Sequence, residues 1–268
     1  MLWRCAGLLI CLVPSEAWTG AWPAPEGGGQ SIVTNTRKVD KVRGLVGQQT
    51  EDIRNEVNFF AEYGFTAETT LGLVISGGFN EGTENGLADE IDAQLHIGGH
   101  LRHLIWRGEN GDVASVEIGA RFPAERWLGN TLGDDRPGSV SEAYVSVLYG
   151  TSWQFDWTNV FISSGLEFRA RGEGLDEEVK LFATGGVQPF HSFMALLDVA
   201  WAEPLGELGQ SSLKLTPSVA LTLMPWVGNN DKKPDLASIP TTIQLGVTWD
   251  AYNPSDGIAF NMSVWRPF

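Results

Sequence analysis

The chain has few cysteines and no excess of basic residues, and each shortage excludes a class of protein. Its two cysteines are Cys5 and Cys11, so a disulfide framework or a cysteine-ligated metal fold is excluded for the rest of the chain. Lysine and arginine together number 18 against 33 aspartates and glutamates, which gives a formal net charge of −15 at pH 7. Because nucleic acids require basic patches that neutralise their phosphates, no nucleic acid partner is expected.

Long apolar runs and catalytic motifs are also missing. No stretch of the chain approaches the ~20 apolar residues of a transmembrane helix. There is no phosphate loop, dinucleotide fingerprint, calcium loop or Ser-His-Asp spacing. In a strand, His96 and His100 would lie ~13 Å apart at ~3.4 Å per residue, too far to share one metal ion. The sequence therefore predicts no enzyme, no metal and no cofactor.

What the chain does contain is long two-residue alternation. Between Ile91 and Trp106 the odd positions are mostly apolar, whereas the even positions include Asp92, His96 and Arg102. This period predicts a strand. Its length exceeds the ~5–6 residues usual in soluble sheets and the ~9–11 residues that cross a bilayer at a tilt.

The same alternation recurs and predicts about twelve strands. The alternating segments are 30–37, 56–63, 70–76, 91–106, 114–122, 142–149, 162–171, 178–184, 193–201, 213–223, 241–249 and 258–268. An even number of strands places both termini on the periplasmic side of a bacterial barrel. Short connections such as 64–68 alternate with longer polar ones such as 38–52, 78–88 and 123–138. The long connection 227–238 breaks this rule and leaves the count open by two strands.

The end of the chain is typical of a Gram-negative outer-membrane barrel. Ile258, Phe260 and Met262 share one face of the last segment, and the chain closes on the aromatic Phe268. We interpret Phe268 as the signal to the barrel-assembly machinery, although Arg266 and Pro267 depart from the usual pattern. The predicted fold is an all-β, transmembrane, antiparallel up-and-down barrel in the outer membrane, with outer-membrane lipids and lipopolysaccharide as partners.

The start of the chain predicts export. Residues 1–17 combine a basic start at Arg4, a short apolar run and small residues at Ser15 and Ala17, as in a cleaved signal peptide. An N-terminal core helix is the alternative, but Pro14 would break it. We expect residues 18–29 to form a periplasmic segment and residues 30–268 to form the barrel.

Aromatic residues at the predicted strand ends suggest two belts at the membrane interfaces. The residues assigned to these belts are Tyr63, Trp106, Trp201, Trp226, Trp249 and Trp265.

One hairpin is similar to a known family. The segment Glu62-Tyr63-Gly64-Phe65-Thr66-Ala67-Glu68-Thr69-Thr70-Leu71-Gly72-Leu73 resembles the hairpin EYGLTDRLTLGL of several outer-membrane barrels. Among these are the transporter barrels grouped with the meta-pathway of phenol degradation. The resemblance covers about a dozen residues and implies a barrel, while it says little about a substrate.

The polar faces of the strands supply the residues expected to line the lumen. They are Arg54, Glu56, Glu62, Asp92, His96, His100, Arg102, Glu117, Arg121, Glu142, Tyr144, Glu167, Arg169, Arg171, Lys180, Asp198 and Lys214. Acids and bases nearly cancel in this set. Such an interior is either a salt-bridged filling or the wall of a small-solute channel, because a barrel of about twelve strands lies between filled eight-stranded barrels and open porins.

The favoured function is a channel for small solutes, aromatic compounds and other small hydrophobic or polar molecules included. A structural or adhesive barrel without transport is the main alternative. An outer-membrane lipid hydrolase is less favoured, because Ala114 and Val116, expected beside the outward-facing His103, offer no nucleophile. A soluble periplasmic β-sandwich that binds a ligand is the remaining alternative.

Overall fold

The computed structural model describes the chain from Gly20 to the last residue, with gaps. The described residues are 20–43, 49–84, 87–88, 92–109, 111–124, 141–172, 175–190, 192–206, 209–223, 240–254 and 257–268. The predicted signal peptide and Trp226 lie outside them, as does the side chain of Asp92. Within the described ranges, no helix has the length and apolar character needed to cross a membrane.

The described residues form thirteen strands. They are β1 (Gly29–Arg43), β2 (Gln49–Gly64), β3 (Thr69–Glu84), β4 (Leu87–Ala88), β5 (Asp92–Arg107), β6 (Val113–Pro123), β7 (Glu142–Phe155), β8 (Thr158–Arg171), β9 (Glu178–Phe190), β10 (Phe193–Pro204), β11 (Ser212–Leu223), β12 (Thr241–Asp250) and β13 (Ile258–Pro267).

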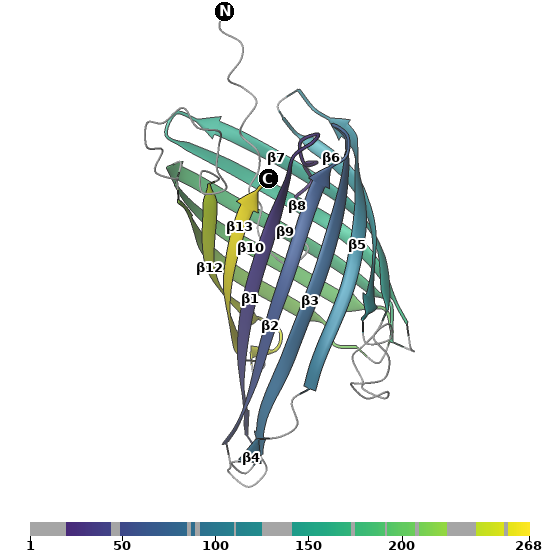
Figure 1. Cartoon of the computed structure of the whole chain (residues 1–268), viewed down its shortest axis with the longest axis vertical. Helices are drawn as coiled ribbons and strands as arrows, with labels where there is room; N and C mark the ends of the chain where they lie inside the picture. Colours follow the sequence, from purple (N-terminus) through teal and green to yellow (C-terminus); the bar gives the residue numbers. More distant parts are fainter. Residues whose placement is uncertain are drawn as a thin grey trace, which may run out of the picture.

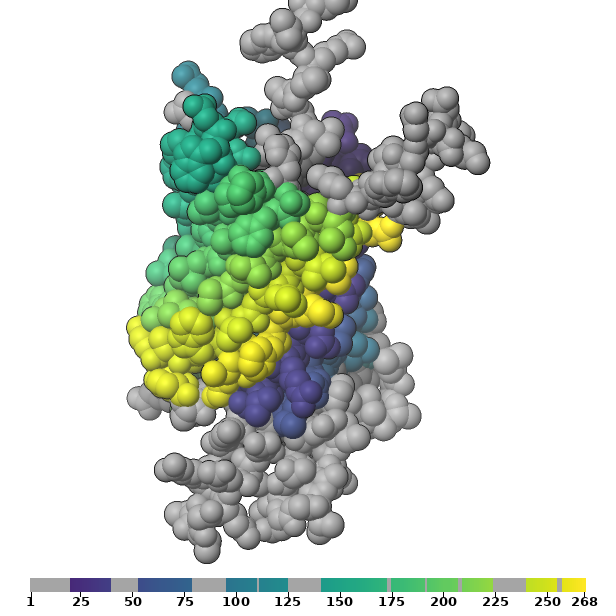
Figure 2. Space-filling model, turned by 90° about the vertical axis from the view of Figure 1, so that its left-hand side faces the viewer, coloured from purple at the N-terminus to yellow at the C-terminus, as the bar shows by residue number. Residues whose placement is uncertain are grey.

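All strands except β4 join one closed ring. Each pairs antiparallel with its neighbours in sequence, β3 pairs with β5, and β13 returns to pair with β1. The short β4 pairs with the end of β3 as a small extension. The tilted strands of the closed wall are seen in Figure 1, and Figure 2 shows the last strands in yellow beside β1 in purple. The prediction of about twelve strands is confirmed, and β11 and β12 are direct neighbours despite the long connection between them.

The wall is apolar outside and polar inside. Exposed large apolar side chains alternate along the strands; they include Val33, Leu73, Leu101, Ile118, Val147, Leu166, Phe168, Leu197, Val219, Leu245, Phe260 and Met262. The opposite parity is buried and largely polar, as with Thr34, Ser76, His96, Ser146, Thr184, Ser218 and Ser263. Soluble proteins bury apolar residues and expose polar ones, so this inverted arrangement excludes the soluble β-sandwich.

On one side of the barrel, the strands extend beyond the segments in which apolar and polar residues alternate. β1 continues to Arg43 and β2 begins at Gln49, so most of the predicted loop 38–52 is strand. The predicted loop 78–88 is likewise shortened, because β3 runs to Glu84. Alternation marks only the part of a strand that faces lipid, whereas backbone pairing between neighbouring strands continues beyond it.

The two ends of the barrel sequence meet at one seam. Gly29 donates its amide hydrogen to the carbonyl oxygen of Phe268 at 2.9 Å, and Phe268 donates to Gly29 at 3.0 Å. The ring of Phe268 also lies against Gly29, where a Cβ atom would approach its ring carbons to 2.6 Å. The last residue of the chain therefore completes the pairing of β1.

Candidate functional site: the barrel lumen

A buried cluster of charges lies on the inner wall formed by β2, β5 and β6. The guanidinium of Arg102 donates from Nε to Glu117 Oε2 at 3.0 Å and also forms an ion pair with Glu62. His100 Nε2 lies 3.4 Å from Glu62 Oε1, and the hydroxyl of Tyr144 donates to Glu117 at 3.2 Å. Arg102 has no exposed surface, so its charge is compensated entirely within the protein.

A second cluster of charged residues lies farther along the lumen, toward the strand ends remote from Phe268. Arg169 on β8 lies 2.6 Å from Glu167 Oε1 and 3.3 Å from Glu142 Oε2. Glu142 also lies 3.5 Å from Arg121 Nε on β6. Beside them, Arg171 pairs with Glu178 on β9 at 3.5 Å.

The strand register explains why these charges pair. It places Arg102 opposite Glu117 and Arg121 opposite Glu142. It also places Arg169 diagonally next to Glu142, and Arg171 diagonally next to Glu178, two positions from the residue directly opposite. Directly opposite side chains on neighbouring strands lie ~4.5–5.5 Å apart at Cβ, so acids and bases alternate within contact distance. The result is a ladder of opposite charges across β5 to β9.

The wall from β11 through β13 to β1 is lined mainly by hydroxyl and amide groups, and Lys214 of β11 adds a charge to it. Its inner hydrogen bonds join Thr34 with Ser263, Gln244 with Ser218, Thr216 with Thr248, and Asn261 with Thr248, at 2.7–2.9 Å. The lumen thus has one charged side and one mainly neutral polar side.

A cavity of about 240 Å³ separates these two sides. Its charged lining consists of Arg169, Glu178, Lys180, Asp198 and Lys214, and its neutral lining includes Thr34, Ser212, Thr216, Thr248 and Asn261. Most of these positions lie toward the strand ends remote from the chain termini, which we assign to the extracellular side. Ala200 and Ala202 lie on β10, between the strands β9 and β11 that carry Lys180 and Lys214. Their small side chains leave room for the cavity.

The other end of the lumen contains the N-terminal segment, residues 20–28. Ala21 has no exposed surface; its amide donates to Ser163 Oγ at 3.3 Å, and its carbonyl accepts from Ser115 Oγ at 2.6 Å. Arg102 Nη1 donates to the carbonyl of Trp22 at 2.9 Å. The amide of Ala24 donates to Thr70 Oγ1 at 2.8 Å.

These contacts carry the segment along the inner wall of the barrel. Glu26 and Gly27 still pair with Gly64 at the end of β2. From there the segment contacts β3, β5 and β6 in turn and reaches Ser163 on β8.

The prediction that residues 18–29 form a periplasmic segment is therefore wrong for residues 20–28. Their backbone groups are bonded by inward-pointing side chains of the barrel. The turn that directs them inward is formed at Gly27, which has a φ of +72°, a conformation that favours glycine. The amide of Gly28 closes this turn by donating to the carbonyl of Pro25 at 2.9 Å.

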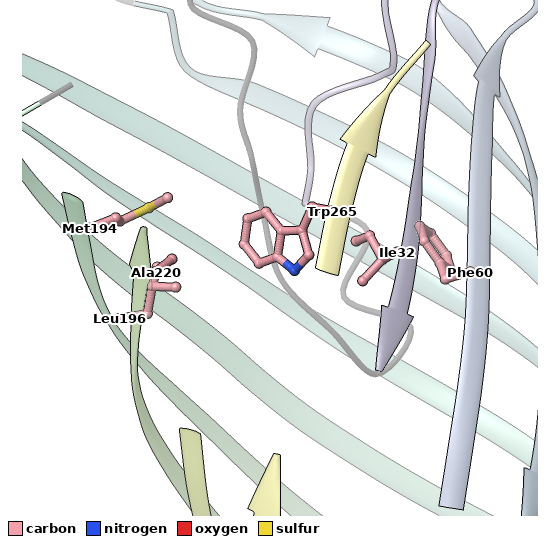
Figure 3. Close-up of a cluster of buried hydrophobic side chains, with 6 residues drawn as sticks. All are labelled: Ile32, Phe60, Met194, Leu196, Ala220 and Trp265. Atoms are coloured by element: carbon pink, nitrogen blue, oxygen red, sulfur yellow. The ribbon is translucent and has the colours of Figure 1, made fainter. Parts of the chain in front are cut away.

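Apolar side chains fill the lumen beside the segment. Figure 3 shows Trp265 between Ile32 and Phe60 on one side and Met194, Leu196 and Ala220 on the other. We call these six residues the apolar cluster. A second group, formed by Leu104, Val113 and Leu148, packs with Ala21 and the indole of Trp22. The described part of the lumen is thus polar and hollow at one end, and filled at the end that holds the termini.

Trp265 was predicted to lie at the membrane interface, but it lies inside the barrel. Its exposed fraction is 0% and it belongs to the apolar cluster inside the barrel. It shares the parity of Ser263, which is also buried, so it cannot point to lipid. Its position at a strand end suggested a belt, but its parity decides the face.

The other described aromatics of the predicted belts lie on the outer surface or at its edge. Tyr63 and Trp106 are 44% and 50% exposed, Trp249 is 38% exposed, and Trp201 is half-buried. Ile105 and Trp106 are exposed together because the pairing of β5 with β6 shifts register between Leu104 and Trp106.

Most of the residues expected in the lumen have their side chains on the inner face. Those that are buried are Glu62, His96, His100, Arg102, Glu117, Glu167 and Asp198. Those that are half-buried are Glu56, Arg121, Glu142, Tyr144, Arg169, Arg171 and Lys180. Arg54 and Lys214 are exposed, and Lys214 lines the cavity.

The residues that sequence reasoning missed are small and uncharged. Thr70, Ser115 and Ser163 hold the N-terminal segment, and Gly150 leaves room for the indole of Trp22, which a Cβ atom would approach to 2.7 Å. Their parity predicted an inner face, but nothing in the sequence indicated a partner for them.

On the outer surface, one contact bears on the hydrolase alternative. Thr69 Oγ1 lies 3.0 Å from His103 Nδ1, so the outward-facing histidine does have a hydroxyl neighbour, on β3 rather than β6. Within the described ranges, no carboxylate contacts this histidine, so a third group that would orient it is not seen.

No protein-family model matches the sequence, and no curated protein matches it. Solved structures match its fold. An outer membrane channel from Pseudomonas putida F1 has a TM-score of 0.54 at 12% identity, over 92% of this chain and 98% of that one. LpxR from Salmonella typhimurium has a TM-score of 0.55 at 8% identity, over 88% of this chain and 99% of that one.

The likeness to these structures concerns the fold alone. Together with the closed ring of twelve strands, the apolar outer surface and the polar lumen, it identifies the chain as a β-barrel of the Gram-negative outer membrane.

Proposed function

We propose that the protein is an outer-membrane channel for small polar solutes and that its lumen is closed in the state described here. The observation that supports this most is the polar cavity in the extracellular half of the barrel. A barrel that serves only as a scaffold has no need of a hollow lined on both sides by hydrogen-bonding groups.

The size of the cavity limits the solute. At about 240 Å³ it is smaller than most ligand pockets, which are ~300–1,000 Å³. It is nevertheless larger than the ~150 Å³ cavity that accommodates benzene in another protein. One small molecule, such as a single-ring compound with polar substituents, fits this space.

The lining favours a solute that carries polar groups at two sides. Arg169 and Lys180 offer positive charge on one side, and Thr248 and Asn261 offer hydroxyl and amide groups on the other. Between these sides, β11 contributes both Lys214 and Thr216. Because acids also line the charged side, solutes of either charge find partners there, and weak multiple contacts allow release as well as binding.

Conductance in planar bilayers tests the proposal. We expect wild type to show discrete, brief openings. Arg169→Ala leaves Glu142 and Glu167 without one of their cations and should shift the reversal potential in a salt gradient toward cation selectivity. Glu142→Ala should shift it toward anions. Leu166→Ala, on the lipid-facing side of the same strand, serves as the control and should change neither conductance nor selectivity.

A structural barrel without transport is the second candidate, and the filled end of the lumen favours it. Absence of conductance in wild type and in the lumen variants would support this alternative. The proposal includes no catalytic role for the Thr69–His103 pair. Phospholipid hydrolysis that is lost in Thr69→Val would contradict that part of it.

A further inference from the structure

The inference concerns regulation of the proposed channel and rests on that function. We infer that residues 20–25, defined here as the plug, leave the lumen reversibly, and that this release opens the path between the outer cavity and the periplasm. In the described state the plug lies in the periplasmic end of the lumen, against the inner faces of β3, β5, β6 and β8.

The plug is held by separate side-chain contacts, whereas the wall is held by continuous pairing. Four hydrogen bonds from Thr70, Arg102, Ser115 and Ser163 fix its backbone, and the indole of Trp22 donates to the carbonyl of Gly111 at 3.4 Å. In contrast, β1 is held by unbroken registers with β2 and β13. Because a closed barrel satisfies its backbone groups within the wall, the plug can leave without opening the barrel.

The groups that hold the plug are suited to losing it. Three of them are hydroxyls, which exchange a peptide partner for water without leaving a charge unpaired. Arg102 keeps its ion pairs with Glu62 and Glu117 after the carbonyl of Trp22 departs. The polar wall can therefore be hydrated once the plug has left, whereas exposure of Leu104, Val113 and Leu148 opposes release and favours the closed state.

A hinge for this movement lies at the base of the plug. The turn Pro25-Glu26-Gly27-Gly28 joins it to β1, and Gly27 already has a positive φ. Three consecutive glycines, Gly27 to Gly29, give the backbone more freedom than any other residue type would. The turn is also bound to the end of β2, since the amide of Gly27 donates to the carbonyl of Gly64 at 2.9 Å. Release of the plug therefore breaks this bond, while Gly29 keeps its pairing with Phe268.

The apolar groups beside the plug explain why it closes the lumen effectively. Trp22 and Ala21 pack against Leu104, Val113 and Leu148, and the apolar cluster is buried in the same end of the lumen. Apolar constrictions block ions because water is not stable within them. Withdrawal of Trp22 removes the largest of the plug's own side chains from this constriction.

A reversible cross-link tests the inference. Ala21→Cys combined with Ser163→Cys joins the plug to β8, where the amide of Ala21 and the hydroxyl of Ser163 are 3.3 Å apart. We expect the oxidised double variant to lose at least ten-fold in open probability and to recover when the disulfide is reduced. Thr222→Cys with Thr242→Cys is the matched control, since it joins two wall strands whose hydroxyls are 2.9 Å apart and leaves the plug free.

A second measurement does not depend on conductance. The single variant Ala21→Cys should react slowly with a membrane-impermeant maleimide, and adding Trp22→Ala should accelerate the reaction at least ten-fold. If Trp22→Ala leaves the labelling rate unchanged, or if the oxidised cross-link conducts like the reduced form, the plug inference is overturned. If labelling accelerates while wild type, the reduced variant and Trp22→Ala all fail to conduct, the plug moves but the proposed channel function is wrong.

Discussion

Arg102 on β5 donates one hydrogen bond to the carbonyl of Trp22 at 2.9 Å while its other nitrogens bind two buried carboxylates. One side chain thus links the fixed wall to the N-terminal segment. The consequences of this and other contacts lead to four predictions.

Removal of Arg102 should destabilise the barrel strongly. Arg102→Ala leaves Glu62 and Glu117 as buried carboxylates without a cation, which costs ~3–5 kcal/mol in other proteins. Urea unfolding in detergent, followed by heat-modifiable migration on gels, measures this loss. Arg171→Ala removes a partly exposed partner of Glu178 and should cost clearly less, so equal losses would contradict the assignment of a buried cluster.

Glycine at position 72 makes room for His100. A Cβ atom there would overlap the imidazole, which is buried and held near Glu62. Gly72→Ala should therefore lower stability by ~1–3 kcal/mol, as overpacking does. Gly185→Ala is the control, because no atom lies within 4 Å of a Cβ built there. The same unfolding assay should show Gly185→Ala close to wild type.

A charge on the outer surface should cost most at the middle of the membrane. Val147 is near the centre of β7 and 53% exposed, so Val147→Arg should destabilise by ~2–4 kcal/mol in lipid. Ile258 begins β13, near the membrane interface, and Ile258→Arg should cost only ~0–1 kcal/mol. Unfolding from lipid vesicles by guanidinium measures both, and the reverse order would refute the assigned membrane position.

Trp265 should contribute through packing rather than through its N–H group. Among the described residues, its Nε1 has no hydrogen-bond partner, and its ring is fully buried in the apolar cluster. Trp265→Ala should cost ~3–5 kcal/mol through the cavity it leaves. Trp265→Phe should cost less than half as much, because no hydrogen bond is lost. Similar losses for the two variants would contradict this view.

Local sequence pattern predicts the fold well because a membrane barrel must alternate. Each strand has one face toward lipid and one toward the lumen, so Leu71 and Leu73 face outward and Thr70 faces inward. The charged lumen residues followed from that parity. Their partners did not, since the pairing of Arg169 with Glu142 depends on the register between β7 and β8, and register is set by the whole ring.

Two features of the lumen were not predicted, for different physical reasons. Trp265 did carry a signal, because it shares parity with Ser263, and the prediction failed by weighing residue type over parity. Residues 20–28 carried none. A short segment rich in glycine and proline has no period, and only the presence of Thr70, Ser115 and Ser163 on three distant strands gives it a place.

The bond between Gly29 and Phe268 also has a consequence for biogenesis. Until β13 pairs with β1, the first strand keeps one unsatisfied edge, and such edges invite pairing with foreign chains. Circle closure between these two strands therefore protects the nascent wall from association with other polypeptides.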